Sequence, residues 1–369
     1  MNMIKNISNS GRGRVATALA SLAFLLWMPL LVHAAPPGYV QTNLVSDIPG
    51  MALHTDPTML NPWGVAFFTG SPFWINENNA GISALFDGTG DSIAALPSVA
   101  IPAPGNVPGG TPTGIVANTF TSAFNIGDLG PALFIFDTED GTIEAWNLGL
   151  TPVTSAVIVV DNSGPAGAVY KGLALATVGT QPYLYATNFR SGKIDVFDGN
   201  FNQVTLGAFT DPKMEKGYAP FGIQTINGNL WVTYTVQDAA KHDPVNRPNH
   251  GIVDVFDTSG NFVRRFVGHN RLNSPWAVVL TPPSFKPLAG KILIGNFGDG
   301  RIPAYDPATG DTIGYLRDTN GKMVSLPGLW ALTYSDALDA TPGALYFTAG
   351  LNHEMDGLFG TFTPEVAGH

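Results

Sequence analysis

Short apolar runs recur along the chain from residue 39 onward, and Gly, Pro, Asn and Asp separate them. Each repeat opens with a small or aromatic residue that follows proline or glycine. The six opening runs are N-P-W-G-V-A-F (61–67), P-T-G-I-V-A (112–117), Y-K-G-L-A-L-A (170–176), A-P-F-G-I-Q-T (219–225), S-P-W-A-V-V-L (274–280) and P-G-L-W-A-L-T-Y (327–334). Short apolar runs bounded by turn residues predict β-strands.

Two further strands follow in every repeat. The second strands are predicted at 73–76, 132–136, 183–188, 229–234, 291–296 and 344–349, and the third strands, which begin at a glycine, at 81–87, 141–147, 192–198, 251–257, 300–306 and 357–362. Between Gly64, Gly114, Gly172, Gly222, Ala277 and Ala331 the spacings are 50, 58, 50, 55 and 54 residues. A period of this length with several strands per unit predicts an all-β fold, a six-bladed β-propeller.

Fourth strands complete the repeats. They are predicted at 92–97, 154–160, 204–209, 262–267 and 312–317, after repeats one to five. The last repeat has none, and Y-V-Q-T-N-L-V-S-D (39–47) is left over before the first repeat. We therefore expect this N-terminal strand to pair into the last blade, which closes the ring and removes an exposed sheet edge. Two stacked β-sandwiches would not explain six copies of one pattern.

Composition agrees with this fold class and excludes others. Only 12% of the 369 residues are charged, while 43 are Gly and 29 are Pro, too many breakers for a helical bundle. With 44% hydrophobic residues the chain is not disordered by charge. The net charge of −10 argues against nucleic acid as a partner. The absence of cysteine excludes disulfides, thiolate metal sites and a cysteine nucleophile.

The N-terminus predicts export. Lys5, Arg12 and Arg14 precede an almost wholly apolar run, 15–32, and the small-residue pattern V-H-A ends at Ala34. This order is typical of a secretory signal peptide, although 18 apolar residues would also suit an uncleaved membrane anchor. We expect a signal peptide at 1–34, a single propeller domain at 35–369, and a secreted or periplasmic protein with no membrane span after cleavage.

The motifs resemble those of six-bladed propellers of the NHL and YWTD types. More closely, the chain resembles an uncharacterised family of exported bacterial propeller proteins, some of which carry a C-terminal PEP-CTERM sorting tail. The resemblance is carried by Y-V-Q-T-N-L-V-S-D, N-P-W-G-V, N-F-x-x-G-x-I-D-V-F-D and S-P-W-A-V. The final P-E-V-A-G-H lacks the apolar span and basic cluster of such a tail. The resemblance implies the fold and export, without surface sorting or an activity.

Several prominent side chains have a structural explanation. Asp87, Asp198, Asp257 and Asp306 end third strands and precede small residues, where a carboxylate caps the backbone of a tight turn. The aromatic residues of the opening runs could form a carbohydrate platform or pack between blades. These residues are Trp63, Phe221, Trp276 and Trp330.

The links of a propeller place histidines on one face. Links between blades and links from second to third strands emerge on the same side of an up-and-down ring. The histidines in such links are His54, His242, His250, His269 and His353. Imidazoles that converge with carboxylates suit Zn²⁺, Cu²⁺ or Fe²⁺. No H-x-x-x-H spacing is present, and histidine also favours surface loops.

Amide and carboxylate oxygens come from the same links. A ring of such oxygens above a central channel could hold Ca²⁺, although Asn and Asp also dominate tight turns. Gluconolactonase-like propellers use a ring of this kind with a Glu at the start of blade one, where this chain has Asn61. The predicted metal residues are His54, His269, His353, Glu354, Asn76, Asn188 and Asn296.

Two classes of function stay open. The first is a secreted binding or scaffold module that presents its loop face to a small ligand, a glycan or a protein, with the chain as a monomer. The second is a metal-dependent hydrolase, lactonase or lyase with an ion at the channel mouth. The sequence favours the binding module because it offers no complete catalytic constellation: G-x-S-x-G does not occur.

Overall fold

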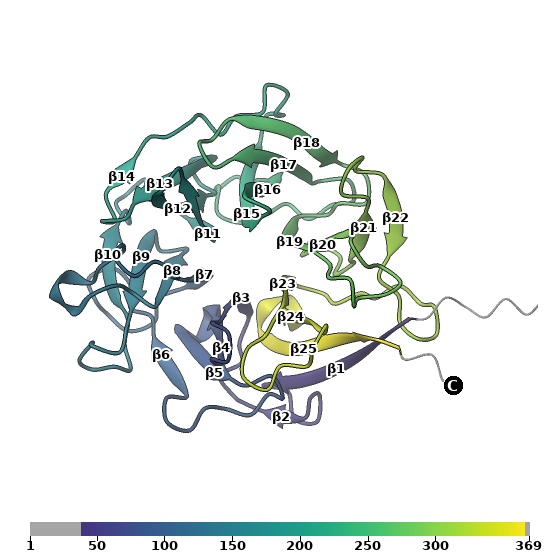
Figure 1. Ribbon diagram of the computed structural model, residues 1–369, viewed down its shortest axis with the longest axis horizontal. Helices are drawn as coiled ribbons and strands as arrows, with labels where there is room; N and C mark the ends of the chain where they lie inside the picture. Colours follow the sequence, from purple (N-terminus) through teal and green to yellow (C-terminus); the bar gives the residue numbers. More distant parts are fainter. Residues whose placement is uncertain (1–37, 366–369) are drawn as a thin grey trace, which may run out of the picture. The chain divides into compact units, whose positions relative to one another are not determined.

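Six sheets of mainly antiparallel strands surround a central axis, each sheet forming one blade of a β-propeller (Figure 1). The computed structural model describes residues 38–365. The predicted signal peptide, 1–34, lies outside the described residues. Within the described part of the chain, no helix has the length and apolar character needed to cross a membrane.

The first three blades follow one another along the chain. Blade one comprises β3 (Pro62–Ala66), β4 (Phe73–Glu77), β5 (Ile82–Phe86) and β6 (Ser98–Ala100). Blade two comprises β7 (Pro112–Ala117), β8 (Phe134–Thr138), β9 (Thr142–Trp146) and β10 (Val157–Asp161). Blade three comprises β11 (Tyr170–Val178), β12 (Gln181–Asn188), β13 (Lys193–Asp198) and β14 (Gln203–Val204). Two 3-10 turns, Asn78–Ala80 and Gly127–Leu129, lie in the links.

The last three blades complete the ring. Blade four comprises β15 (Tyr218–Ile226), β16 (Asn229–Val236), β17 (Ile252–Asp257) and β18 (Phe262–Gly268). Blade five comprises β19 (Pro275–Leu280), β20 (Ile292–Asn296), β21 (Pro303–Tyr305) and β22 (Thr312–Tyr315). Blade six comprises β23 (Leu329–Tyr334), β24 (Leu345–Gly350), β25 (Asp356–Pro364), β1 (Tyr39–Ser46) and β2 (His54–Thr55), with α1 (Leu351–Glu354) between β24 and β25.

The N-terminal strand closes the last blade, as the sequence predicts. β1 pairs antiparallel with β25 from Tyr39 opposite Pro364 to Ser46 opposite Leu358. The two-residue β2, which was not predicted, adds a parallel fifth strand outside β1. Because the two ends of the chain share one sheet, blade six cannot form completely without both of them.

Two fourth strands differ from the prediction. In blade one the strand is β6, which begins at Ser98, and the predicted segment 92–97 makes only an isolated bridge, between Ser92 and Phe86. Pro97 has no N–H to donate, so the regular ladder starts after it. In blade three the predicted segment 204–209 contributes only its first residue to the two-residue β14.

The recurrent glycine of the opening runs lets the innermost strands come close together. A Cβ on Gly64 would lie 2.5 Å from the carbonyl oxygen of Thr113 in blade two, and one on Gly222 would overlap the carbonyl oxygen of Trp276 in blade five. Non-bonded atoms cannot approach so closely, so these positions exclude a larger residue. Gly64 and Gly222 therefore mark close contacts between the innermost strands of neighbouring blades.

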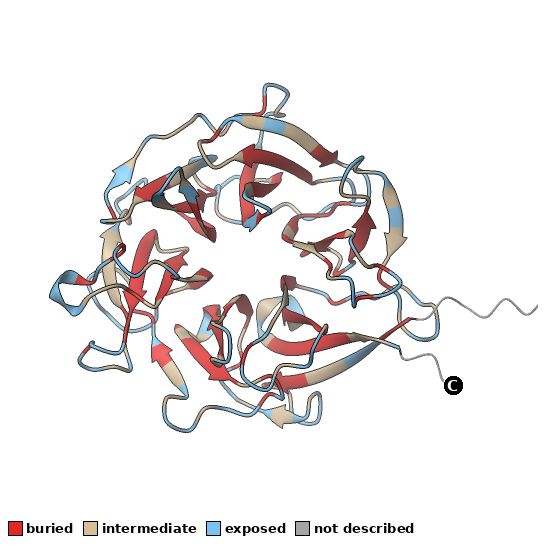
Figure 2. Cartoon of the chain, viewed as in Figure 1, coloured by how far each residue is buried: buried red, intermediate tan, exposed pale blue. Residues whose placement is uncertain are grey.

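Buried residues lie mainly on the strands of the blades (Figure 2). On β4, Phe73 and Ile75 pack toward blade six, whereas Trp74 packs toward blade two. The acidic turn residues cap backbone N–H groups as expected, with Asp87 Oδ1 accepting from Thr89 N at 2.8 Å and Asp198 Oδ1 from Asn200 N at 2.8 Å. Asp257 and Asp306 do the same.

Candidate functional site

A cluster of aromatic rings packs together at the starts of the innermost strands. The Trp63 and Trp330 rings stack with centroids 3.4 Å apart, and Phe297 stacks on Trp330 at 4.1 Å. Phe189 and Phe221 belong to the same buried group, and Trp276 packs against it. Trp63, Trp330 and Phe221 are at most 2% exposed. The aromatic residues of the opening runs therefore form a floor inside the ring and not an exposed carbohydrate platform.

One buried cation rests on this floor. Lys171, the second residue of β11, is 1% exposed, and its Nζ lies 5.2 Å from the ring centre of Trp63 and 5.8 Å from that of Phe189. The ammonium contacts the Glu139 carboxylate and lies 3.6 Å from Asp243 Oδ1. Aromatic faces attract a cation most strongly where water is excluded. Lys171 is therefore held by two carboxylates and two rings.

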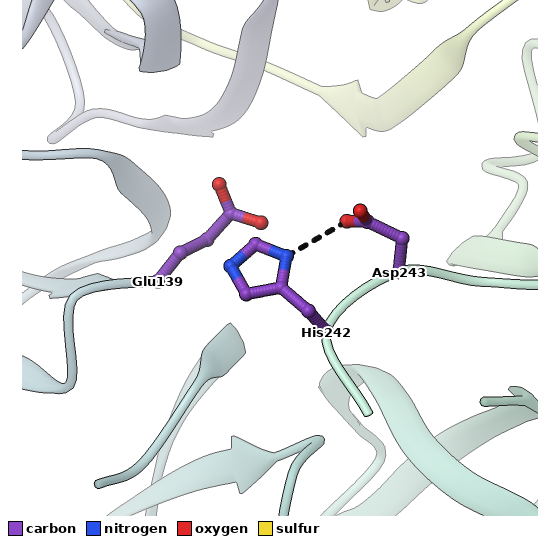
Figure 3. Close-up of side chains that lie close together, drawn as sticks. All are labelled: Glu139, His242 and Asp243. Atoms are coloured by element: carbon purple, nitrogen blue, oxygen red, sulfur yellow. Dashed lines mark hydrogen bonds and ion pairs between the residues drawn. The ribbon is translucent and has the colours of Figure 1, made fainter. Parts of the chain in front are cut away.

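Glu139, His242 and Asp243 lie together at this point (Figure 3). Glu139 comes from the link between β8 and β9, and the other two come from the link between β16 and β17. Their ligand atoms lie within 4.8 Å of one another, and His242 Nδ1 is 2.9 Å from Asp243 Oδ1. Imidazole and carboxylate donors suit Zn²⁺, Cu²⁺ or Fe²⁺. The group is thus able to receive a cation.

The hydrogen bond between His242 and Asp243 shifts the pKa of both residues. The hydrogen bond with Asp243 raises the pKa of His242 above its ordinary value, because the imidazolium form is the better donor. The hydrogen bond with His242 lowers the pKa of Asp243. His242 and Asp243 are 37% and 65% exposed, so both can meet a ligand from solvent.

Glu354, at the end of α1 in blade six, is a third carboxyl group near Lys171. Its Oε2 accepts a hydrogen bond from Asn61 Nδ2 at 3.0 Å, and Asn61 Oδ1 accepts one from Trp330 Nε1 at 2.8 Å. Burial raises the pKa of Glu354, and the charge of Glu139 contributes to the shift. Asn78 in blade one donates to Glu139 Oε2 at 3.0 Å. Link residues of blades one, two, four and six therefore meet around Lys171. We call this group, Glu139, Lys171, His242, Asp243 and Glu354, the mouth cluster.

Glu354 is positioned by an unusual backbone. Asn352, His353 and Glu354 have φ values of 49°, 58° and 68°, a left-handed turn of three successive residues other than glycine. Such conformations are costly for residues with a Cβ and persist only where neighbouring contacts impose them. The carbonyl oxygen of Glu354 accepts a hydrogen bond from Asn79 Nδ2 at 2.6 Å, which helps to hold the turn.

The structure does not bring the predicted histidines together. His54 lies in β2, the outermost strand of blade six, with its Nδ1 3.5 Å from Asp91 Oδ1. Four strand spacings of about 4.8 Å separate β2 from the innermost strand β23. His269 Nε2 lies 2.7 Å from Glu215 Oε1, and His353 is exposed in α1. Among residues 38–365, no group of three histidines or acids at metal-binding distance includes any of them.

The predicted amide ligands serve the backbone instead. Asn76 Nδ2 donates to the carbonyl oxygens of Thr113 and Gly114 in blade two. Asn188 Oδ1 accepts from Ser191 N, and Asn296 Oδ1 accepts from Asn273 N. These three side chains are buried, and they join links and neighbouring blades. Of the seven predicted metal residues, Glu354 alone lies in the mouth cluster.

Sequence reasoning missed Lys171 and Asp243 as site residues. It named the link 137–140, which contains Glu139, only as one of several sources of oxygen ligands, and it placed His242 on the link face without choosing it as a ligand. A signal was available for one of them. Lys171 is the only charged residue in the second position of an opening run, where the other repeats have apolar or small residues or Thr. The pairing of Glu139 with a loop two blades away left no pattern in a single sequence.

Comparisons with known proteins place the chain in a family. No family model matches it. It is 32% identical over 327 residues to an uncharacterized protein of Acanthamoeba polyphaga mimivirus, covering 86% of this chain and 78% of the relative. The chain belongs to the same family as this mimivirus protein. A second uncharacterized protein of the same virus is 30% identical over 338 residues, covering 87% of this chain and 85% of the relative. These family members are viral, so they do not show membership of the exported bacterial family that the motifs resemble.

Several solved structures are similar to the structure of this chain. One is catalytically inactive virginiamycin B lyase from Staphylococcus aureus with quinupristin, at 14% identity and a TM-score of 0.49, covering 89% of this chain and 99% of that chain. Another is the GH93 alpha-L-arabinofuranosidase of Fusarium graminearum with arabinobiose, at 13% identity and a TM-score of 0.49, covering 88% of this chain and 98% of that chain.

Proposed function

We propose that the protein is an exported binding module that receives its ligand at the mouth cluster. The observation that supports this most is the buried Lys171 ammonium, held between Glu139 and Asp243 on an aromatic floor. Burying an ion pair costs desolvation energy that an apolar plug would not, so the arrangement is not needed to stabilise the ring. A buried charged group beside an exposed carboxylate at a ring centre is typical of a ligand site.

The charge of the mouth cluster defines the ligand class. Glu139, Asp243 and Glu354 supply three carboxyl groups against the single ammonium of Lys171. Asp243 is largely exposed, and His242 beside it gains a proton readily. A ligand that carries an amine or another cationic group would complete the charge pairing. The cationic group would be part of a small molecule, of a glycan or of a basic side chain in a protein partner.

A metal-dependent hydrolase, lactonase or lyase is the second candidate. Glu139, His242 and Asp243 could hold an ion that polarises a carbonyl or activates water. However, the Lys171 ammonium already contacts Glu139 and lies 3.6 Å from Asp243. A metal would have to displace that ammonium from both carboxylates. This competition favours the binding module.

Calorimetric titration with putrescine, a short dication, tests the proposal. We expect saturable binding to the wild type and none with succinate, a dianion of the same carbon count. Asp243→Asn should weaken binding at least tenfold. Asp91→Asn is the matched control, because Asp91 is also an exposed acid paired with a histidine but lies at the outer edge of the ring. Equal loss in both variants, or no binding by the wild type, would contradict a cation site at the mouth.

Metal analysis separates the two candidates. Stoichiometric Zn, Cu or Fe in mildly purified protein would support the enzyme. Lys171→Met extends the test, since removing the competing ammonium should tighten metal binding if the three residues form a metal site. Absence of metal in both proteins supports the binding module.

Export is part of the proposal. Cleavage after Ala34 would leave a mature chain that begins at Ala35, and we propose that it acts as a monomer. Mass spectrometry of secreted protein should find Ala35 or a near neighbour at the N-terminus. Full-length chain in a membrane fraction would support the anchor instead.

A further inference from the structure

A second group of acidic side chains lies where the last blade meets the first. Asp47 follows β1, Asp56 follows β2, Glu77 ends β4 and Asp356 begins β25. None of the ion pairs formed within residues 38–365 includes any of these four carboxylates. None of these four residues belongs to the mouth cluster, and they play no part in the proposed function.

Gly357 links these segments. Its N–H donates to Asp47 Oδ1 at 2.8 Å, and its carbonyl oxygen accepts from Ser46 Oγ at 2.7 Å. A Cβ on Gly357 would overlap the backbone of Met59 and approach the ring of Pro62, the residue that pairs with Glu77 across β3 and β4. Asp47 and Glu77 therefore reach the same junction from different blades.

Asp56 is the third acidic residue at this junction. Its N–H donates to the carbonyl oxygen of Ser46 at 3.0 Å, directly beside Asp47. Its Oδ1 accepts from both the N–H and the hydroxyl of Thr58. Asp47 and Asp56 are each half-buried, so their carboxyl groups can still rotate.

Glu77 is the unusual member of the group. Its side chain is completely buried, and neither carboxylate oxygen has a hydrogen-bond partner among residues 38–365. Burial raises the pKa of Glu77 well above its ordinary value, and the negative charges of Asp56 and Asp47 add to the shift. The nearby Thr58 hydroxyl, which donates to Asp56 at 2.8 Å, lowers the pKa of Glu77 only in part. A buried carboxyl group without a hydrogen-bond partner is costly when it is ionised, and a bound cation would supply the counter-charge that the ionised form lacks.

We propose that Glu77, Asp47 and Asp56 bind a divalent cation of the calcium class at the junction of blades six and one, with Asp356 beside them. Carboxylate oxygens without nitrogen or sulfur donors are the ligands that Ca²⁺ prefers. In the present geometry the carboxylates do not lie within one coordination sphere. Binding therefore includes rotation of the half-buried Asp47 and Asp56 toward Glu77, which the strand fixes in place. The ion joins β1, β4 and the start of β25, the segments that close the ring.

Calcium titration of protein treated with EDTA tests the inference. We expect saturable Ca²⁺ binding by calorimetry at pH 7.5 and weaker Mg²⁺ binding, because Mg²⁺ sheds water reluctantly. Mass action predicts that Ca²⁺ at a hundredfold excess over Kd multiplies the ratio of folded to unfolded protein about 100-fold. Urea unfolding measures this ratio. No change on adding Ca²⁺ to the wild type would overturn the proposal.

Glu77→Gln provides the decisive variant. It removes the ionisable group but keeps the shape, so in EDTA it should be at least as stable as the wild type and should lose the calcium effect. Glu144→Gln is the matched control: Glu144 is also buried, with Oε2 unpaired, but lies in blade two. It should keep the full calcium effect. Asp56→Asn, at a half-buried position, should weaken binding at least tenfold without unfolding the ring. An equal calcium effect in Glu77→Gln and the wild type would also overturn the proposal.

Discussion

The Lys171 ammonium of blade three lies 5.2 Å from the ring centre of Trp63, the second residue of the innermost strand of blade one. This contact joins the aromatic floor to the charged group above it. The indole of Trp276 in blade five donates to the Lys171 carbonyl oxygen at 2.7 Å. Lys171 therefore links three blades at the centre of the ring.

Replacing Lys171 should lower the free energy of unfolding, because its ammonium balances the negative charge of nearby carboxylates. Lys171→Met leaves Glu139, which is only 12% exposed, without its cationic partner. Removal of one member of a buried ion pair typically costs about 3–5 kcal/mol. We expect the free energy of unfolding in urea to fall by this order. The double variant Lys171→Met/Glu139→Gln should recover most of the loss, whereas additive losses would show that the two residues do not act as a pair.

Adding a side chain at a close contact between two innermost strands should destabilise the ring. A Cβ at Gly222 would overlap the carbonyl oxygen of Trp276 in the next blade, so Gly222→Ala forces the two strands apart. We expect a loss of about 1–3 kcal/mol, the usual cost of overpacking. Gly314→Ala is the control, since no atom of the described chain lies within 4 Å of its Cβ position. Thermal unfolding should leave the control within a few degrees of the wild type, and an equal loss in both would refute the close-approach explanation.

Asp137 should make stability depend on pH. Burial raises its pKa to about 7, against about 3.9 in an unfolded chain. Between these values the folded state holds a proton that the unfolded state has released, so the free energy of unfolding falls as pH rises and levels off above pH 7. From pH 5 to pH 7.5 the wild type should lose about 2 kcal/mol more than Asp137→Asn. Parallel pH profiles would show that Asp137 is not buried with a raised pKa.

The N-terminal strand should be required for the whole ring. A chain that lacks residues 35–47 loses the pairing of β1 with β25. We expect the entire domain to melt at lower temperature in a single transition, because blade six would present an open edge. A chain that begins at residue 36 serves as the control. If the shortened chain melted at the control temperature, closure by β1 would not stabilise the ring.

The sequence predicts the fold well because the fold repeats. Six copies of one pattern, together with the extra strand at 39–47, define the number of blades and the way in which they close. The errors occur where local pairing is short: Pro97 delays the fourth strand of blade one, and β2 adds a strand of only two residues. No apolar pattern distinguishes such a strand from a link.

The site is less predictable because it is built from single residues of different blades. The topology correctly places His242 and Glu354 on the link face, but it does not say how far from the axis a link residue lies. His54 was expected at the mouth, and β2 holds it at the outer edge of blade six. Asn76, Asn188 and Asn296 recur at similar positions because the backbone needs amide partners there. Recurrence in a repeat therefore indicates structure more often than ligand binding.

The titration of His242 during ligand addition tests the central claim most directly. Asp243 raises the pKa of His242 in the free protein. A cation bound at the mouth would compete with the imidazolium, so binding must lower that pKa. NMR of the histidine Cε1–H signals, assigned with His242→Gln, should show the His242 signal moving along a saturable curve as putrescine is added, with its pKa falling toward or below about 6.5. Putrescine binding that leaves His242 unchanged and moves another histidine signal would contradict a ligand site at the mouth.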